Sequence, residues 1–273
     1  MSNLITRTLA GAVFAALIIG SIIWHPLAVL GVFFIFNAIA LFEFSRMFQQ
    51  KGYNIPAASL IFLGSAVYLL IALFAKRDLD ATALLLIIPL LFTLFMASLY
   101  KIDEKPFETL GIKVLAIIYI SIPFALFNMV ENMGLMNSYE NEPLFLIGFF
   151  LLVWSSDTFA YLSGITFGKH RLFERISPKK SWEGSIGGAI ATMIIAYFFG
   201  VYTQIFDPIT WVIIALLTVI TATFGDLIES QLKRSMGVKD SGNIMPGHGG
   251  ILDRFDAAIF SIPFYVFLLY LLA

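Results

Sequence analysis

The 273-residue chain contains no cysteine, so disulfide bonds, thiolate zinc sites and cysteine nucleophiles are all excluded. Charged residues are also scarce, at 13% of the chain, and the three histidines are too scattered to suggest a histidine-rich metal site. Hydrophobic residues make up 59% of the sequence and include 28 phenylalanines. This composition is typical of an integral membrane protein and excludes an ordinary soluble domain.

Apolar runs long enough for a helix to cross a bilayer occur at about nine places. Only His25 and Pro26 separate the first two, which predicts a tight helical hairpin with Pro26 in the first turn of its second helix. Arg7 and the apolar run after it resemble a signal peptide, but the next span follows at once, so an uncleaved first helix is expected. The predicted spans are 8–24, 26–44, 57–75, 81–99, 109–130, 143–164, 183–205, 209–229 and 254–272.

No fixed-period repeat and no linker rich in proline or serine divides the chain. We therefore predict an all-α, polytopic integral membrane protein with a single domain over 1–273. Its N-terminal helices would occupy about 1–130 and its catalytic part about 143–273.

The distribution of basic residues predicts the orientation in the membrane. With a cytoplasmic N-terminus, every lysine and arginine except Lys76 and Arg77 falls on the inner side, and the outer loop from Glu131 to Glu142 has no basic residue. The positive-inside rule therefore predicts a cytoplasmic N-terminus. It also places the loops 165–182 and 230–253 on the cytoplasmic face.

The polar residues gather in the segment from Ser230 to Asp256, which holds four basic residues, three carboxylates and five glycines. Lysine, arginine and backbone N–H groups bind phosphate, and glycine lets the backbone approach a ligand closely. The G-x-x-x-x-G-K-[ST] spacing of a Walker A loop is absent. The segment predicts a membrane enzyme that acts on a phosphorylated or nucleotide substrate.

Carboxylates at the ends of the last two spans predict a metal site. A helix places Asp226, Glu229 and Lys233 on one face, although a solvated helix end with a Glu229–Lys233 pair is an alternative for Glu229. Asp226 and Asp253, from different helices, could together hold a hard cation such as Mg²⁺, whereas Zn²⁺ fits less well. Asp256 is assigned to the same site, with stabilisation of the helix dipole as the alternative.

Further polar groups lie upstream of this segment. Asp157 lies well inside the sixth span and is predicted to face a polar cavity, where it would pair with a lysine or a substrate group. Its neighbours Ser155, Ser156 and Thr158 are equally well explained as helix-packing residues. Lys179 and Lys180 are interpreted either as substrate-binding residues or as charges attracted to anionic lipid.

The remaining notable residues receive structural interpretations. Gly184 and Gly188 form a small-xxx-small face that predicts close helix packing. Glu43 and Arg46 are interpreted as interfacial anchors. His25 and His170 are given no role.

The polar segment resembles the signature of the phosphatidate cytidylyltransferases (CDP-diacylglycerol synthases), S-x-x-K-R-x4-K-D-x-G-x3-P-G-H-G-G-x-x-D-R-x-D. The upstream sequences SPKKSWEG and WSSDTFAY also look like those of this family, and the multi-span layout extends the resemblance over the whole chain. Every fixed position of the signature is met, by Ser230, Lys233, Arg234, Lys239, Asp240, Gly242, Pro246, Gly247, His248, Gly249, Gly250, Asp253, Arg254 and Asp256.

The resemblance implies transfer of a cytidylyl group from CTP to phosphatidate, giving CDP-diacylglycerol and pyrophosphate. It implies dependence on Mg²⁺, with K⁺ as a candidate second metal, and places the active site at the cytoplasmic face of the cell (inner) membrane. The bilayer, CTP and phosphatidate are the expected partners. No nucleic acid is expected, and a homodimer is left open.

The resemblance also implies roles for individual residues, of which His248 either donates a hydrogen bond or shapes its turn. The residues expected at the reacting phosphates are Lys233, Arg234, Lys239, Asp240, His248 and Arg254. Those expected to bind substrate are Asp157, Lys179, Lys180, Ser230, Gly247, Gly249 and Gly250, and the expected metal ligands are Asp226, Asp253 and Asp256.

Three alternatives remain open from the sequence. The same chemistry could act on another lipid, either an archaeal-type ether-lipid phosphate or a polyprenol phosphorylated with CTP. A transporter for a phosphorylated solute would carry polar residues at the midplane of several helices, whereas here they gather towards one face. A purely structural scaffold leaves the polar segment unexplained.

Overall fold

The computed structural model of the chain describes residues 3–100, 102–131, 142–245 and 249–272. Within these ranges, eight helices are long and apolar enough to cross a membrane, and a shorter apolar helix covers Thr8–Trp24. The prediction of an all-α polytopic protein with about nine spans is confirmed.

The chain divides into two compact units. Unit 1 comprises Met1–Met133 and Met236–Phe255, and unit 2 comprises Gly134–Ser235 and Asp256–Ala273. Most of the polar segment, Met236–Phe255, is therefore grouped with the N-terminal helices. The interpretation of 1–273 as one domain stays a prediction.

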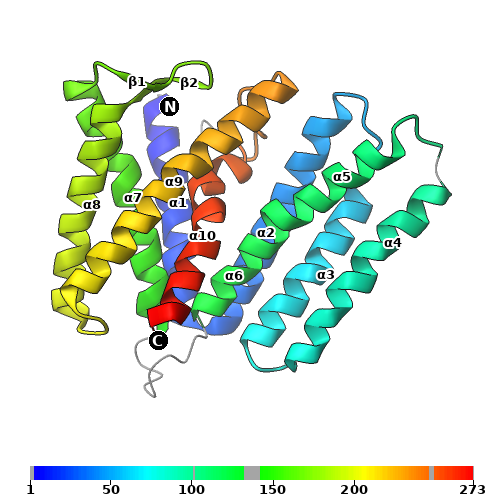
Figure 1. The fold of residues 1–273 in the computed structure, drawn as a ribbon, viewed down its shortest axis with the longest axis horizontal. Coiled ribbons are helices and arrows are strands. Elements are labelled where there is room, and N and C mark those ends of the chain that lie inside the picture. The colour runs from blue at the N-terminus through cyan, green and yellow to red at the C-terminus, as the bar shows by residue number, and fades with distance from the viewer. Residues whose placement is uncertain (1–2, 101, 132–141, 246–248, 273) are drawn as a thin grey trace. The chain divides into compact units, whose positions relative to one another are not determined.

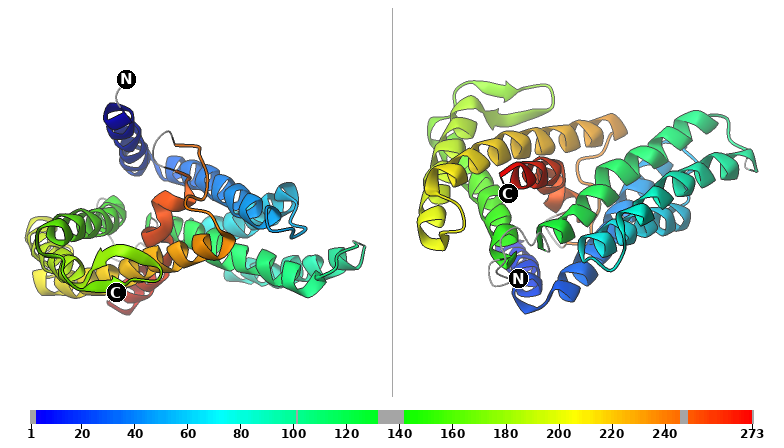
Figure 2. Two further views of the ribbon diagram at one scale, coloured as in Figure 1. Left: turned by 90° about the horizontal axis from the view of Figure 1, so that it is seen from above. Right: turned by 60° about the horizontal axis from the view of Figure 1, so that its bottom comes forward.

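Unit 1 is a set of packed helices in which α2 and α3 lie against each other and both contact α6 (Figures 1 and 2). A π-helical turn, η2, interrupts the fifth predicted span just before Pro123, whose ring cannot fit against the carbonyl four residues earlier. The elements are α1 (Asn3–Trp24), α2 (Pro26–Gln49), α3 (Ala57–Ala75), η1 (Ala81–Leu86), α4 (Ile87–Leu99), α5 (Pro106–Ala116), η2 (Ile117–Ser121) and α6 (Ile122–Glu131).

The hairpin between α1 and α2 forms as predicted, with Pro26 at the start of α2. His25 precedes it in an extended conformation, and its Nδ1 accepts a hydrogen bond from the Leu27 amide at 3.1 Å. His25 is therefore the N-cap of α2, a role that the sequence analysis did not assign.

A cluster of phenylalanines forms the core of unit 1 and fixes the start of α10 (Leu252–Leu272). The ring of Phe255, in the first turn of α10, lies 4.9 Å from that of Phe124 and 5.2 Å from that of Phe36. Phe33 and Phe127 complete the cluster. The neighbouring polar residues Asp253 and Arg254 are thereby attached to a rigid apolar core.

Unit 2 is built on the close packing of α7 and α8 (Figure 1). A Cβ atom on Gly188 would lie 2.9 Å from the Ser156 carbonyl oxygen, and one on Gly184 would lie 2.8 Å from that of Ala160, so only glycine permits this approach. The prediction of close packing at both glycines is confirmed. The elements are α7 (Glu142–Phe167), the antiparallel strands β1 (Arg171–Phe173) and β2 (Ser177–Ser181), α8 (Trp182–Thr203), α9 (Pro208–Met236) and α10 from Asp256 onward.

Asp207 begins α9 as a helix cap. Its carboxylate accepts hydrogen bonds from the Thr210 hydroxyl and from the amides of Thr210 and Ile209, which hold the pKa of Asp207 below its usual value. Pro208 follows at the first helical position, where no amide is required. Asp207 thus marks the N-terminal end of α9, whereas Asp226 lies in the C-terminal half of the helix.

Candidate functional site

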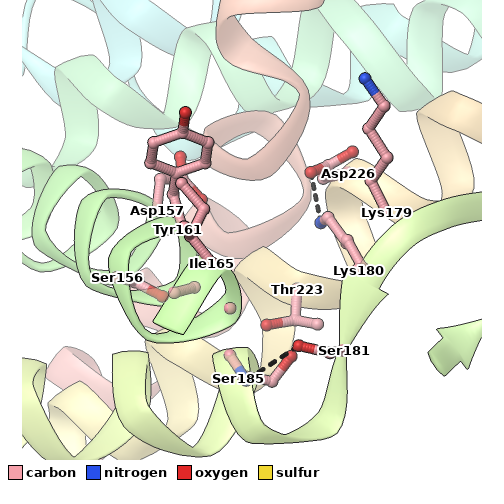
Figure 3. Close-up of a pocket in the computed structure, with 13 residues that line it drawn as sticks. Ser156, Asp157, Tyr161, Ile165, Lys179, Lys180, Ser181, Ser185, Thr223 and Asp226 are labelled. Carbon is pink, nitrogen blue, oxygen red and sulfur yellow. Dashed lines mark hydrogen bonds and ion pairs between the residues drawn. The ribbon is translucent and has the colours of Figure 1, made fainter. Parts of the chain in front are cut away.

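A cavity of about 400 Å³ opens in unit 2 between α7, α8, α9 and the strand β2 (Figure 3). Asp157 and Tyr161 contribute from α7, Lys179 and Lys180 from β2, and Asp226 from α9. Asp157 lines this cavity, as the sequence predicted, although most of the exposed surface of the cavity is apolar. Apolar residues of α7, among them Ala160 and Ile165, form another part of the wall.

The two lysines are held at the cavity by the fold of the β1–β2 hairpin, where the sequence analysis expected only a loop. Ser181 follows Lys180 and caps α8, since its hydroxyl oxygen accepts a hydrogen bond from the Gly184 amide at 3.2 Å (Figure 3). A residue next to a helix cap has little freedom to move. Lys180 is therefore directed into the cavity by local structure.

Lys180 forms an ion pair with Asp226 across the cavity (Figure 3). Both side chains are 28% exposed, so the pair is accessible from the cavity. The Ser230 hydroxyl, one turn further along α9, donates a hydrogen bond to Asp226 Oδ1 at 3.2 Å. Three residues predicted for the site are thus brought into contact.

Asp226 belongs to a group of carboxylates. Asp256, on α10, is near enough to Asp226, Glu229 and Asp157 to interact with them electrostatically. Gly225 permits this arrangement, because a Cβ atom there would lie 2.7 Å from both the Asp256 carbonyl oxygen and Phe260 Cβ. The closeness of α9 and α10 at Gly225 therefore places Asp226 beside Asp256.

Glu229 and Lys233 form an ion pair one turn apart on α9. Glu229 has no exposed surface and Lys233 is 8% exposed. The pair belongs to the alternative of a solvated helix end and does form, but Glu229 is buried, so the solvated part of that alternative is wrong. Lys233 stabilises a buried carboxylate, and its contact with a nucleotide stays a prediction.

The start of α10 and the glycine loop before it are held by carboxylates within unit 1. Asp253 Oδ2 accepts hydrogen bonds from the Ser241 amide (2.8 Å), the Ser241 hydroxyl (3.0 Å) and the Gly250 amide (2.8 Å). Glu43, on α2, accepts bonds from the amides of Ile251 and Leu252. Glu43 is 2% exposed, so its interpretation as an interfacial anchor is wrong.

The other predicted residues of the polar segment are largely exposed. Lys239, Asp240 and Arg254 in unit 1 and Arg234 in unit 2 present their side chains at the surface. Gly249 has φ +87°, a conformation that favours glycine. Gly247 and His248, together with Pro246 and most of the outer loop 131–142, lie outside the described residues.

The structure thus groups the predicted residues in two sets without testing their chemical roles. Unit 2 contains Asp157, Lys179, Lys180, Asp226, Ser230, Lys233, Arg234 and Asp256. Unit 1 contains Lys239, Asp240, Gly249, Gly250, Asp253 and Arg254.

His170 and Glu43 also have partners that the sequence did not predict. His170 Nδ1 lies 2.6 Å from Glu183 Oε1, so His170 has a partner after all. Glu43 could have been found, because it lies between Phe42 and Phe44 in an apolar span, the same signal that singled out Asp226. Tyr161 ends the sequence WSSDTFAY but was not predicted to line a cavity, and nothing in the sequence pointed to Thr223.

The chemistry of the carboxylate group suits a hard cation. Among the described residues, no group of three or more His, Cys, Asp or Glu side chains is arranged so that it could hold a metal ion as it stands. The acidic residues near Asp226 nevertheless offer carboxylate oxygens, the ligands that Mg²⁺ takes in proteins, although Lys180 pairs with Asp226 in this structure. The predicted magnesium site stays a prediction with a suitable set of donors.

The fold and the site together define a polytopic membrane protein with lysine side chains beside a group of carboxylates in a cavity. The model of the cytidylyltransferase family matches residues 5–272, and the chain belongs to this family.

Curated relatives agree with this assignment. The phosphatidate cytidylyltransferase of Bacillus subtilis is 34% identical over 275 residues, covering 98% of this chain and 96% of its own length. That of Staphylococcus haemolyticus is 35% identical over 258 residues, covering 90% and 94%. That of Haemophilus influenzae is 45% identical over 136 residues, covering 46% and 47%.

Proposed function

We propose that the chain transfers a cytidylyl group from CTP to phosphatidate, releasing pyrophosphate and forming CDP-diacylglycerol for phospholipid synthesis. The observation that carries this proposal is the cavity of unit 2, where Lys179, Lys180 and Asp226 meet apolar residues of α7. Such a lining suits an amphiphile with a phosphate head group. Membership of the cytidylyltransferase family supports CTP as the second substrate.

The reaction needs no nucleophile from the protein. A phosphomonoester has a second pKa of about 6, so the lipid phosphate is already largely dianionic at neutral pH. Its oxygen attacks the α-phosphorus of CTP, a new P–O bond forms, and the bond to the β-phosphate oxygen breaks as pyrophosphate leaves. The barrier is the repulsion and alignment of two anionic reactants, which positioned cations lower.

The basic residues supply this positive charge. Lys179 and Lys180 bind the lipid phosphate in the cavity, which Asp157 also lines. Ser230, which donates a hydrogen bond to Asp226, is proposed to bind substrate beside it. Lys233, Arg234, Lys239 and Arg254 neutralise the triphosphate, with Asp240 and His248 beside them. The amides of Gly247, Gly249 and Gly250 donate hydrogen bonds to phosphate oxygens.

Asp226, Asp253 and Asp256 are the proposed ligands of Mg²⁺, with K⁺ as a candidate second metal. The electrostatic interaction of Asp226 with Asp256 supports these two residues as ligands. Asp253 is oriented by three hydrogen bonds, as metal-ligating carboxylates are. When bound, the divalent ion would supply positive charge to offset the negative charge of the nucleotide and of the departing pyrophosphate.

The protein spans the membrane several times, and its bacterial relatives support the cell membrane as its location. The proposed orientation places the N-terminus and the active site in the cytoplasm, where CTP is present. The diacylglycerol chains of the substrate stay in the lipid. A homodimer remains part of the proposal.

The experiment that tests this function measures release of pyrophosphate from CTP by the purified protein in detergent micelles. We expect release only when phosphatidate and Mg²⁺ are both present, and loss of activity when the divalent ion is chelated. An ether-lipid phosphate and a polyprenol serve as alternative acceptors. CTP-dependent phosphorylation of the polyprenol would yield CDP instead of pyrophosphate and would contradict the proposal.

A further inference from the structure

Glu43 forms a buried connection between α2 and the residues that precede and begin α10, all within unit 1. Its Oε1 accepts a hydrogen bond from the Ile251 amide at 3.0 Å, and its Oε2 accepts bonds from the Leu252 amide at 2.9 Å and the Ser241 hydroxyl at 3.1 Å. Three donors from the polar segment therefore converge on one carboxylate about 200 positions earlier in the chain.

The chemistry of this connection requires a carboxylate. The first amides of a helix have no acceptor within it, and a negative charge at that end is favoured by the helix dipole. The amides of Ile251 and Leu252 take different oxygens of Glu43, so both oxygens must be acceptors. Glutamine offers one acceptor oxygen, and its NH₂ group would oppose one of the N–H donors.

Ser241 links Glu43 to Asp253. Its hydroxyl lies 3.1 Å from Glu43 Oε2 and 3.0 Å from Asp253 Oδ2. A hydroxyl has a single proton and can donate to only one of these carboxylates at a time, while the Ser241 amide donates to Asp253 throughout. The two carboxylates together hold the described residues on both sides of 246–248.

Two signature glycines are explained by Glu43 without reference to a ligand. A Cβ atom on Gly242 would lie 2.8 Å from Glu43 Cδ, and one on Gly250 would lie 2.5 Å from the same carbon. The backbone at these positions therefore packs directly on the carboxyl group. A side chain at either position would push Glu43 away from its donors.

We propose that Glu43 is a positioning residue for the cytidylyl transfer. Its carboxylate accepts hydrogen bonds from Ser241, Ile251 and Leu252, and it thereby holds the backbone next to Lys239, Asp253 and Arg254. A small displacement of groups that bind phosphate in the transition state lowers turnover strongly, even when the binding of substrates persists. This inference rests on the proposed function and adds a residue outside the signature to it.

The test compares the wild type with Glu43→Gln, a change of similar size and shape. We expect kcat to fall about 10- to 100-fold, while the KM for phosphatidate, whose cavity lies in unit 2, changes little. Hydrogen–deuterium exchange at Ile251 and Leu252 should become about tenfold faster or more, since a hydrogen bond to a charged acceptor is lost or weakened. Glu131→Gln, which changes another buried carboxylate of unit 1, is the matched control.

A second pair of variants tests the same contact by changing Gly242, the residue that packs on Glu43. Gly242→Ala should reproduce the fall in kcat, because its methyl group meets Glu43. Gly111→Ala, on α5, adds a methyl group where no atom lies within 4 Å and should keep wild-type kcat. This pair separates a local effect of the contact from a general loss of folding.

The outcomes distinguish the inference from the function on which it rests. Absence of pyrophosphate release by the wild type would overturn the proposed function. An active wild type with unchanged kcat in both Glu43→Gln and Gly242→Ala would overturn the role of Glu43 alone. An equal fall in kcat in Glu131→Gln would also overturn it.

Discussion

Replacement of Asp226 by asparagine is expected to lower the rate of cytidylyl transfer at least about 100-fold. Asparagine preserves the size of the side chain and an acceptor for the Ser230 hydroxyl. It removes the negative charge that pairs with Lys180 and that a divalent cation requires. The turnover rate should therefore fall while the protein still folds.

The measurement is the initial rate of pyrophosphate release at saturating CTP, phosphatidate and Mg²⁺, for protein that elutes as a single species and melts at the wild-type temperature. Asp207→Asn, at the other end of α9, is the matched control and should keep wild-type activity. Wild-type turnover in folded Asp226→Asn would show that this carboxylate takes no part in the reaction.

Replacement of Lys180 by methionine is expected to raise the KM for phosphatidate about 10- to 100-fold, the loss anticipated for a hydrogen bond to a charged group. Methionine keeps much of the aliphatic length of lysine and removes its charge. The effect should be larger for phosphatidate than for CTP, because Lys180 lies in the cavity that also exposes apolar residues of α7.

Steady-state kinetics with each substrate varied in turn separate these effects. Lys169→Met, an exposed lysine outside the cavity, should leave both KM values unchanged. A rise in the Mg²⁺ requirement with an unchanged KM for phosphatidate would show that Lys180 serves the carboxylates and not the lipid.

Much of the fold follows from local sequence. Apolar runs of sufficient length predict each span, and Pro26 predicts the start of α2. Gly184 and Gly188 predict close packing of their helix, although the sequence does not name α7 as its partner. Each of these features depends on residues close in sequence and on general properties of helices in lipid. They were therefore open to prediction without a structure.

The contacts of the site depend on residues far apart, and sequence predicted fewer of them. Asp157 was placed in a cavity correctly because a charge inside a span needs a polar neighbour. The hydrogen bonds that the Ile251 and Leu252 amides donate to Glu43 join residues more than 200 positions apart. No local sequence pattern predicts such a contact. The burial of Glu229 likewise depends on how other helices cover α9.

The proposed function requires a divalent cation, for which Asp226, Asp253 and Asp256 are the proposed ligands. The most direct test is anomalous scattering from crystals of the protein grown with Mn²⁺ as a probe for Mg²⁺. We expect a Mn²⁺ peak at the carboxylate of Asp226, and its loss in Asp226→Asn. A Mn²⁺ ion bound away from Asp226, Asp253 and Asp256, and retained in Asp226→Asn, would contradict the account.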